Sequence, residues 1–216
     1  MLLSRIYKPQ EGNIEIDEQN IWNYKIKDFA KKVAVVHQKN QIYGDQDVKT
    51  IVGYGRLPYL HYSQKLTAKD YEIIDWALEV THLKEYQNRT LKSLSGGQQQ
   101  RVWIAMALAQ KTPYLLLDEP TNGLDPAGIH EIRNLVKSLP KRYDCTILIS
   151  SHMLSEIELL ADDIGILNHG RLLFEGSLED LKFTAHESGF ENDNLEEMFL
   201  SMIDEDNKNR KQRLKL

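Results

Sequence analysis

Short apolar runs alternate with amphipathic stretches along most of the chain. Three of the runs have the length of strands: residues 33–36, 114–117 and 146–150. Apolar residues also recur at helical spacing, over residues 66–82, over 98–110 and again after Pro126. The alternation predicts an α/β fold with a mostly parallel sheet, in which residues 114–117 and 146–150 form buried strands.

Local signals place the beginnings of two helices. Thr67 is a suitable N-cap for the helix that follows it, and Asp70 stands three residues later as a partner in a capping box. Pro126 occupies the favourable first-turn position of another helix. We therefore expect helices to begin close to these residues.

A hairpin is predicted in the last third of the chain. Residues 164–167 and 171–174 are apolar runs, and they flank Asn168-His169-Gly170, a sequence typical of a tight turn.

The end of the chain is more polar. Ser177 is expected to cap a short helix, and residues 184–194 are expected to form a loop. One more helix is predicted over residues 195–203, followed by a charged, frayed tail over residues 204–216.

The composition is that of an ordinary globular protein. Apolar residues make up 41% and charged residues 27% of the 216 residues, and no run approaches the roughly 20 apolar residues that span a bilayer. Any association with a membrane is therefore expected to come through a partner protein. The formal net charge of −5 argues against bulk binding of nucleic acid, so no nucleic-acid partner is expected.

The single cysteine, Cys145, cannot form an internal disulfide. It adjoins a predicted strand, where a small buried thiol is expected. Such a chain suits the reducing cytoplasm.

A glycine-containing segment, Leu94-Ser95-Gly96-Gly97-Gln98, directly precedes a predicted helix. Two glycines at a helix N-terminus leave backbone N–H groups free to face an anion, and the helix dipole favours negative charge there. The Ser95 hydroxyl adds a further donor. Taken alone, so short a segment also fits a flexible turn, so its weight depends on the residues that follow.

Two adjacent acids, Asp118 and Glu119, end the apolar run 114–117. Ligands bind outside the carboxyl ends of the strands in open α/β sheets. There Asp118 could hold Mg²⁺, usually through water, and Glu119 could polarise an attacking water. A lone pair of acids also fits a solvated strand end, and that alternative stays open for the pair by itself.

A histidine follows the neighbouring predicted strand, in Ser150-Ser151-His152. An imidazole at this edge could contact a terminal phosphate. A lone histidine is more often structural, but its place beside the acidic strand favours a functional role.

Together these motifs resemble those of the ATP-binding subunits of ABC transporters. Residues 94–98 resemble the signature motif, and residues 115–119 resemble Walker B with its catalytic glutamate. Asp125 resembles the D-loop aspartate, His152 the switch histidine and Gln38 the Q-loop glutamine. All five motifs occur in the family's order and at similar spacing.

The resemblance implies a fold and a domain organisation. The implied fold is a P-loop NTPase (RecA-like) ABC ATPase core with a helical subdomain, N-terminally truncated. Residues 1–181 would form the ATPase domain, with the helical subdomain over about residues 45–110. Residues 182–216 would form a C-terminal extension with a short helix and a charged tail.

In this family, two nucleotide-binding domains sandwich ATP between the Walker motifs of one and the signature motif of the other. By resemblance, Ser95, Gly96, Gly97 and Gln98 would face the γ-phosphate of the ATP that the opposite subunit binds. Asp125 would couple the two sites across the dimer.

The remaining site residues would act on the chain's own nucleotide. Asp118 and Gln38 would serve Mg²⁺, and Gln38 would also sense the membrane subunit. Glu119 would be the general base or orient the water, and His152 would steady the terminal phosphate.

The resemblance further implies ATP and Mg²⁺ as cofactors. The implied partners are a second ABC ATPase subunit and an integral membrane permease. The subunit would lie in the cytoplasm, peripheral to the inner face of the cell membrane.

The chain departs from the family in one motif. No Gly-x-x-x-x-Gly-Lys-Ser/Thr, the Walker A phosphate loop, occurs in it, and Met1-Leu2-Leu3 resembles the start of the helix that normally follows that loop. Walker A supplies the N–H cradle, the phosphate-binding lysine and a Mg²⁺-binding hydroxyl. The chain alone is therefore expected to bind ATP poorly and to fold marginally.

Different parts of the chain resemble two subfamilies. Gly53-Tyr54-Gly55-Arg56-Leu57-Pro58-Tyr59 and residues 101–110 resemble ferric-siderophore importer ATPases. Residues 128–139 and 150–158 resemble bacitracin or lantibiotic export and immunity ATPases, with the change near residues 122–125. A natural recombinant is one hypothesis for this pattern. Iron-chelate import is favoured as the function, because the siderophore-like half contains residues 38–95, and the corresponding region contacts the membrane subunit in the family.

Two alternatives to an ATPase subunit stay open. The chain could be a non-catalytic partner that completes one composite site on an intact subunit, or a remnant without function. An SMC-like repair ATPase is disfavoured, because the chain has no sustained heptads.

Overall fold

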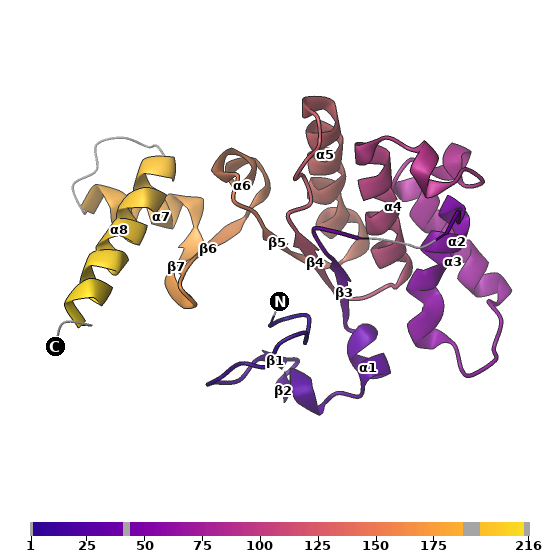
Figure 1. Ribbon diagram of the computed structural model, residues 1–216, viewed down its shortest axis with the longest axis horizontal. Coiled ribbons are helices and arrows are strands. Elements are labelled where there is room, and N and C mark those ends of the chain that lie inside the picture. The colour runs from indigo at the N-terminus through magenta and orange to yellow at the C-terminus, as the bar shows by residue number, and fades with distance from the viewer. Residues whose placement is uncertain (1, 41–43, 188–194, 214–216) are drawn as a thin grey trace. The chain divides into compact units, whose positions relative to one another are not determined.

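The computed structural model describes residues 2–40, 44–187 and 195–213 (Figure 1). The chain divides into two compact units, Met1–Ser150 and Ser151–Leu216. This division lies before the boundary at residue 181 that family resemblance suggests for the ATPase domain, and that domain boundary stays a prediction. Within the described residues, no helix is long and apolar enough to cross a membrane.

A three-stranded parallel sheet lies in the first unit. Its strands are β3 (Val33–Val36), β4 (Tyr114–Asp118) and β5 (Thr146–Ser150), in the order β3-β4-β5. The register pairs Val36 with Leu117 and Asp118 with Ser150. The predicted parallel sheet is thereby confirmed, and the carboxyl ends of all three strands meet at one edge.

The expected burial of residues 146–150 is wrong. Side chains of β5 alternate between half-buried and exposed, and Leu148 is 51% exposed. Among the described strands of this sheet, β5 is an outer strand that pairs with β4 alone, so one of its edges is unpaired. Cys145, just ahead of β5, is likewise half-buried rather than buried, and burial raises the pKa of its thiol.

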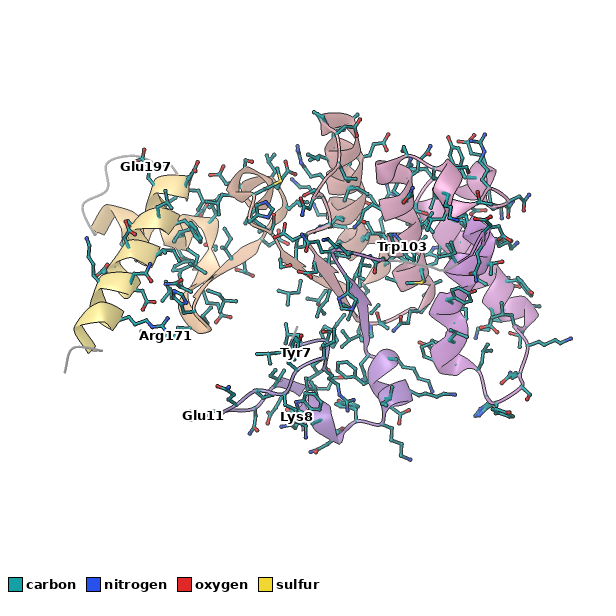
Figure 2. All side chains as sticks on the ribbon, viewed as in Figure 1. Tyr7, Lys8, Glu11, Trp103, Arg171 and Glu197 are labelled. Atoms are coloured by element: carbon teal, nitrogen blue, oxygen red, sulfur yellow. The ribbon has the colours of Figure 1, made fainter. Side chains whose placement is uncertain are left out.

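Three helices pack against one another between β3 and β4 of the sequence: α2 (Val48–Gly53), α3 (Ala68–Val80) and α4 (Gly96–Ala109). The predicted capping box of α3 is present, because Thr67 accepts a hydrogen bond from the Asp70 N–H and Asp70 accepts one from the Thr67 N–H. Ile51, Ile74, Leu78 and Ile104 are fully buried among these helices. Trp103, labelled in Figure 2, is also buried on α4.

The long helix α5 (Pro126–Tyr143) packs beside α4, with Pro126 in its first turn as predicted. Asp125 caps it, because the carboxylate accepts a hydrogen bond from the Gly128 N–H at 3.1 Å. Ile132, Val136 and Leu139 recur at helical spacing and are buried.

The N-terminal part of the first unit carries short elements. They are β1 (Glu15–Ile16), β2 (Gln19–Asn20) and α1 (Ile26–Ala30). The described residues of the unit also form 3₁₀ segments at Ile21–Asn23, Tyr54–Tyr59, Lys84–Tyr86 and Leu91–Ser93. Residues 2–6 form turns and a bend. Arg5 lies over the Trp22 and Phe29 rings, which ties these turns to a small apolar cluster.

The second unit contains α6 (Leu154–Leu160), β6 (Asp163–Asn168), β7 (Arg171–Ser177), α7 (Leu178–Glu187) and α8 (Leu195–Arg213). The predicted hairpin is confirmed, with His169 and Gly170 at positive φ (47° and 78°) in its two-residue turn. Ser177 caps α7 through reciprocal hydrogen bonds with Asp180, also as predicted.

Two expectations for the end of the chain are wrong. Residues 184–187 continue α7 instead of forming a loop, and 188–194 lie outside the described residues. Residues 204–213 continue α8, whereas 214–216 lie outside the described residues. The extension of α8 is held by Asp206, which is buried and accepts hydrogen bonds from Asn168 and from Arg171 of β7, a residue labelled in Figure 2.

A buried ion pair joins the segment after α2 to α3 and α4. The Arg56 Nε donates to the Asp70 carboxylate at 2.9 Å, and its Nη1 donates to the Ala109 carbonyl at 2.8 Å. Asp70 also accepts from the Thr67 hydroxyl at 2.6 Å, and this bond is the main cause of the lowered pKa of Asp70. Gly55 completes the junction, because a Cβ there would lie 2.1 Å from the Met106 carbonyl oxygen.

Replacing Asp70 by Asn tests this junction. We expect Asp70→Asn to lower the free energy of unfolding by about 3 kcal/mol, because Arg56 would keep a buried charge without its carboxylate. Urea unfolding measures the change. Asp45→Asn, in the exposed pair of Lys92 and Asp45, is the control and is expected to leave the free energy of unfolding unchanged within error.

The same comparison has a defined pH dependence. Because the folded-state pKa of Asp70 is lowered, its stabilising contribution is fully present above its unfolded-state pKa of about 3.9 and is lost as the pH falls through the folded-state value. The gap between the wild type and Asp70→Asn should therefore narrow below about pH 4. A gap that is constant from pH 7 to pH 3 would contradict this role of Asp70.

Candidate functional site

Three of the predicted site residues come from the carboxyl ends of neighbouring strands. Asp118 is the last residue of β4, Glu119 follows it, and Gln38 lies two residues beyond the end of β3. Because β3 and β4 pair in parallel, the structure brings these three positions to one edge of the sheet.

Asp118 is held in place by the next strand. The Ser150 hydroxyl donates to the Asp118 carboxylate at 2.5 Å, across the register pair that joins the ends of β4 and β5. One carboxylate oxygen is thus oriented while the half-buried side chain still reaches the sheet edge. Sequence reasoning did not assign a role to Ser150, although its position at the end of a predicted strand in Ser150-Ser151-His152 was the available signal.

Glu119 has an unusual backbone conformation. Its φ of 50° lies in the left-handed region, which costs a residue with a Cβ about 1 kcal/mol. Two backbone hydrogen bonds offset that cost: the Glu119 N–H donates to the Ser150 carbonyl at 3.0 Å, and the Asn122 N–H donates to the Glu119 carbonyl at 3.1 Å. The chain therefore turns sharply after Asp118, and the half-buried Glu119 begins the loop to α5.

The glycine-containing segment forms the first turn of α4. Ser95 is the N-cap, its hydroxyl oxygen accepts from the Gln98 N–H at 3.3 Å, and the Gln98 side chain accepts from the Ser95 N–H at 3.0 Å. Gln98 is therefore occupied as a capping-box partner. The Ser95 O–H proton is not used in that pair of bonds, and both Ser95 and Gly96 are exposed, so a donor and a bare backbone remain accessible.

The same turn packs on the start of α5. Gly97 is buried, and a Cβ on it would lie 3.3 Å from the Gly128 Cα. A Cβ on Gly128 would lie 2.8 Å from the Asp125 carboxylate oxygen. Glycine at position 97 therefore suits the close approach of the two helix starts, and glycine at position 128 leaves room for the Asp125 cap. Gly128 is a second residue whose part in the site sequence reasoning did not identify.

His152 belongs to the second unit. It is exposed and stands two residues after Ser150 along the chain. Next to it, the Ser151 hydroxyl accepts from the Met153 N–H at 3.1 Å. The association of His152 with Asp118 and Glu119 stays a prediction from the sequence.

The oxygen donors at the sheet edge suit a hard cation. No cluster of three or more His, Cys, Asp or Glu side chains able to hold a metal occurs in the described part of the chain. Mg²⁺ does not require one, since it is commonly held by one or two carboxylates together with water and substrate phosphates. Asp118 and the Gln38 side-chain carbonyl supply donors of the right kind.

Comparison with known proteins gives one family. The chain matches the ABC transporter family over residues 1–122. It is 40% identical over 180 residues to the petrobactin import ATP-binding protein FpuC of Bacillus anthracis, and the match covers 83% of this chain and 66% of that protein. It is 38% identical over 183 residues to the bacitracin transport ATP-binding protein BcrA of Bacillus licheniformis, and this match covers 84% of this chain and 56% of that protein.

A solved structure supports the same fold. The structure of cbiO1 from Clostridium perfringens, described as part of the ABC transporter complex cbiONQ, matches with a TM-score of 0.73 and 30% identity. The match covers 87% of this chain and 74% of that one. The α/β fold is thus that of ABC nucleotide-binding domains, and the predicted resemblances to both siderophore importers and bacitracin transporters are confirmed. The chain spans just under two thirds of the length of FpuC and just over half of that of BcrA.

Substitutions of Ser95 measure how much its cap stabilises α4. Ser95→Ala is expected to lower the free energy of unfolding by about 1 kcal/mol, because the Gln98 N–H loses its acceptor. Ser95→Gly should lower it by only about a few tenths of a kcal/mol. Chemical denaturation of both variants measures the difference. Equal stability of Ser95→Ala and the wild type would show that the cap does not stabilise α4.

Proposed function

Because the chain belongs to the ABC transporter family, we propose that it is the ATP-binding and ATP-hydrolysing subunit of an iron–siderophore importer. The observation that carries this proposal is the 40% identity over 180 residues to a protein named for petrobactin import. A second ABC ATPase subunit and a membrane permease would be its partners, and it would act at the cytoplasmic face of the membrane.

The chain's own residues divide into two groups in this proposal. Asp118 and Gln38 would hold Mg²⁺, which when bound neutralises charge on the phosphates. Ser150 orients the Asp118 carboxylate for that role. Glu119 would accept a proton from the attacking water or orient that water. Its φ of 50° sets the direction in which the side chain leaves the backbone.

The second group would act on the nucleotide of the opposite subunit. Ser95 would donate its O–H to a terminal phosphate, while Gly96 and Gly97 would present backbone N–H groups at the positive end of α4. Gln98 would keep this turn in shape through the capping box. Asp125 would reach across the dimer from the start of α5, and His152 would steady the terminal phosphate.

A chromosomal Glu119→Gln replacement tests the proposed activity and cargo together. Loss of a general base typically slows a reaction about 100-fold or more, so uptake of radiolabelled ferric petrobactin should fall at least about tenfold. Glu72→Gln, an exposed position on α3, is the matched control and should leave uptake unchanged. Bacitracin tolerance is measured in the same strains.

The outcomes separate the two transport directions. Unchanged tolerance with lost uptake supports import. Retained uptake with lowered bacitracin tolerance would contradict it and favour an export function, the candidate that the 38% identity to BcrA supports. Retention of both would count against an ATPase role for Glu119.

The complete cap and glycine contacts at the start of α4 favour one further candidate, a partner that completes a composite site on an intact subunit. In that case, adding the purified chain should stimulate the ATPase of an intact ABC subunit. Ser95→Gly should abolish the stimulation while sparing stability, and Glu119→Gln should leave it unchanged. Absence of any stimulation by the wild-type chain would remove this candidate.

A further inference from the structure

We propose that a cavity of about 250 Å³ in the first unit binds a small monocarboxylate with an apolar body. The cavity lies at the amino-terminal ends of β4 and β5, beside the C-terminal ends of α4 and α5. The residues that define its chemistry are Trp76, Leu108, Lys111, Leu115, Tyr143 and Asp144.

Apolar and aromatic side chains supply part of the lining. Leu108 and Leu115 are buried, with 7% and 3% of their surface exposed, and they contribute aliphatic surface to the lining. Trp76 and Tyr143 meet edge to face, with ring centroids 4.9 Å apart and an interplanar angle of 84°. Both rings line the cavity and contribute aromatic surface to it.

A single cation stands at this surface. The Lys111 ammonium lies 3.2 Å from the centroid of the Trp76 ring, and burial lowers the pKa of Lys111. Within the residues that the structure describes, no carboxylate lies within ion-pair distance of this ammonium. Lys111 as a whole residue is exposed, so water also reaches its ammonium. An ammonium has three N–H donors and the ring faces only one side of it, so a carboxylate in the cavity would replace water as an acceptor in a charge-assisted hydrogen bond.

The rim limits the charge of the ligand to one. Asp144 lines the cavity at its exposed end, and burial together with the Asp144 charge raises the pKa of the Cys145 thiol. The Cys145 thiol is therefore an uncharged part of the lining. A ligand with a second negative charge would meet Asp144, which favours a monoanion over a phosphate or a dicarboxylate.

The cavity is distinct from the proposed nucleotide site. It lies at the Tyr114 end of β4, whereas Asp118 ends the same strand about 13 Å away at the usual strand rise. Its volume is below the roughly 300–1,000 Å³ of most drug-sized ligand sites, so it fits a fragment and not a nucleoside triphosphate. The inference goes beyond the proposed transport function and does not depend on it.

Titration with 3-phenylpropionate tests the site, with 3-phenylpropionamide as the uncharged match. The readout is the indole N–H NMR signal of Trp76, assigned with Trp76→Phe, in the purified chain. We expect a saturable shift with the carboxylate and binding at least about tenfold weaker with the amide, because the charge-assisted bond to Lys111 is lost. Lys111→Met should weaken carboxylate binding by a similar factor.

Lys69→Met supplies the matched control. Lys69 is an exposed lysine near the start of α3, the helix that carries Trp76, and its replacement should leave binding unchanged. Circular dichroism checks that both variants are folded. Absence of saturable binding to the wild type, equal binding of acid and amide, or unchanged binding in a folded Lys111→Met variant would each overturn the proposal.

Discussion

The parallel pairing of β4 with both β3 and β5 is the constraint on which the first unit depends. Parallel strands end on the same side, so three segments far apart in the sequence deliver their polar ends to one edge. The pairing of Asp118 with Ser150 adds a side-chain hydrogen bond to the backbone register. A slip of one residue would turn every side chain of β4 to the opposite face and bury Asp118 where Leu117 now packs.

Several residues of the candidate site also hold the fold. Ser95 and Asp125 cap α4 and α5, Gly97 suits the close approach of those two helix starts, and Gly128 leaves room for the Asp125 cap. The motif Gly53-Tyr54-Gly55-Arg56-Leu57-Pro58-Tyr59 has a structural role too, since Gly55 and Arg56 lock the segment after α2 onto α4. Loss of function in a variant at these positions therefore has to be separated from loss of stability.

Sequence periodicity predicted the elements well where local chemistry marks their ends. The capping box at Thr67, the N-cap at Ser177 and the turn at His169-Gly170 were placed correctly, because each depends on residues close in sequence. The exposure of β5 could not be predicted, because an apolar run has the same composition in an outer and in a central strand. The continuation of α8 depended on Asp206 meeting Arg171, a contact across 35 residues that no local pattern contains. The roles of Ser150 and Gly128 were missed for the same reason, since each acts through a residue on another element.

The central claim is that the sheet edge and the first turn of α4 handle the terminal phosphate of ATP from two different subunits. Its most direct test is a structure of the gene product with Glu119→Gln, trapped with ATP and Mg²⁺. We expect Asp118 and Gln38 oxygens around the Mg²⁺ of one subunit, with the Ser95 hydroxyl and the Gly97 N–H of the other at the γ-phosphate. A nucleotide bound elsewhere, with these groups facing solvent, would contradict the claim.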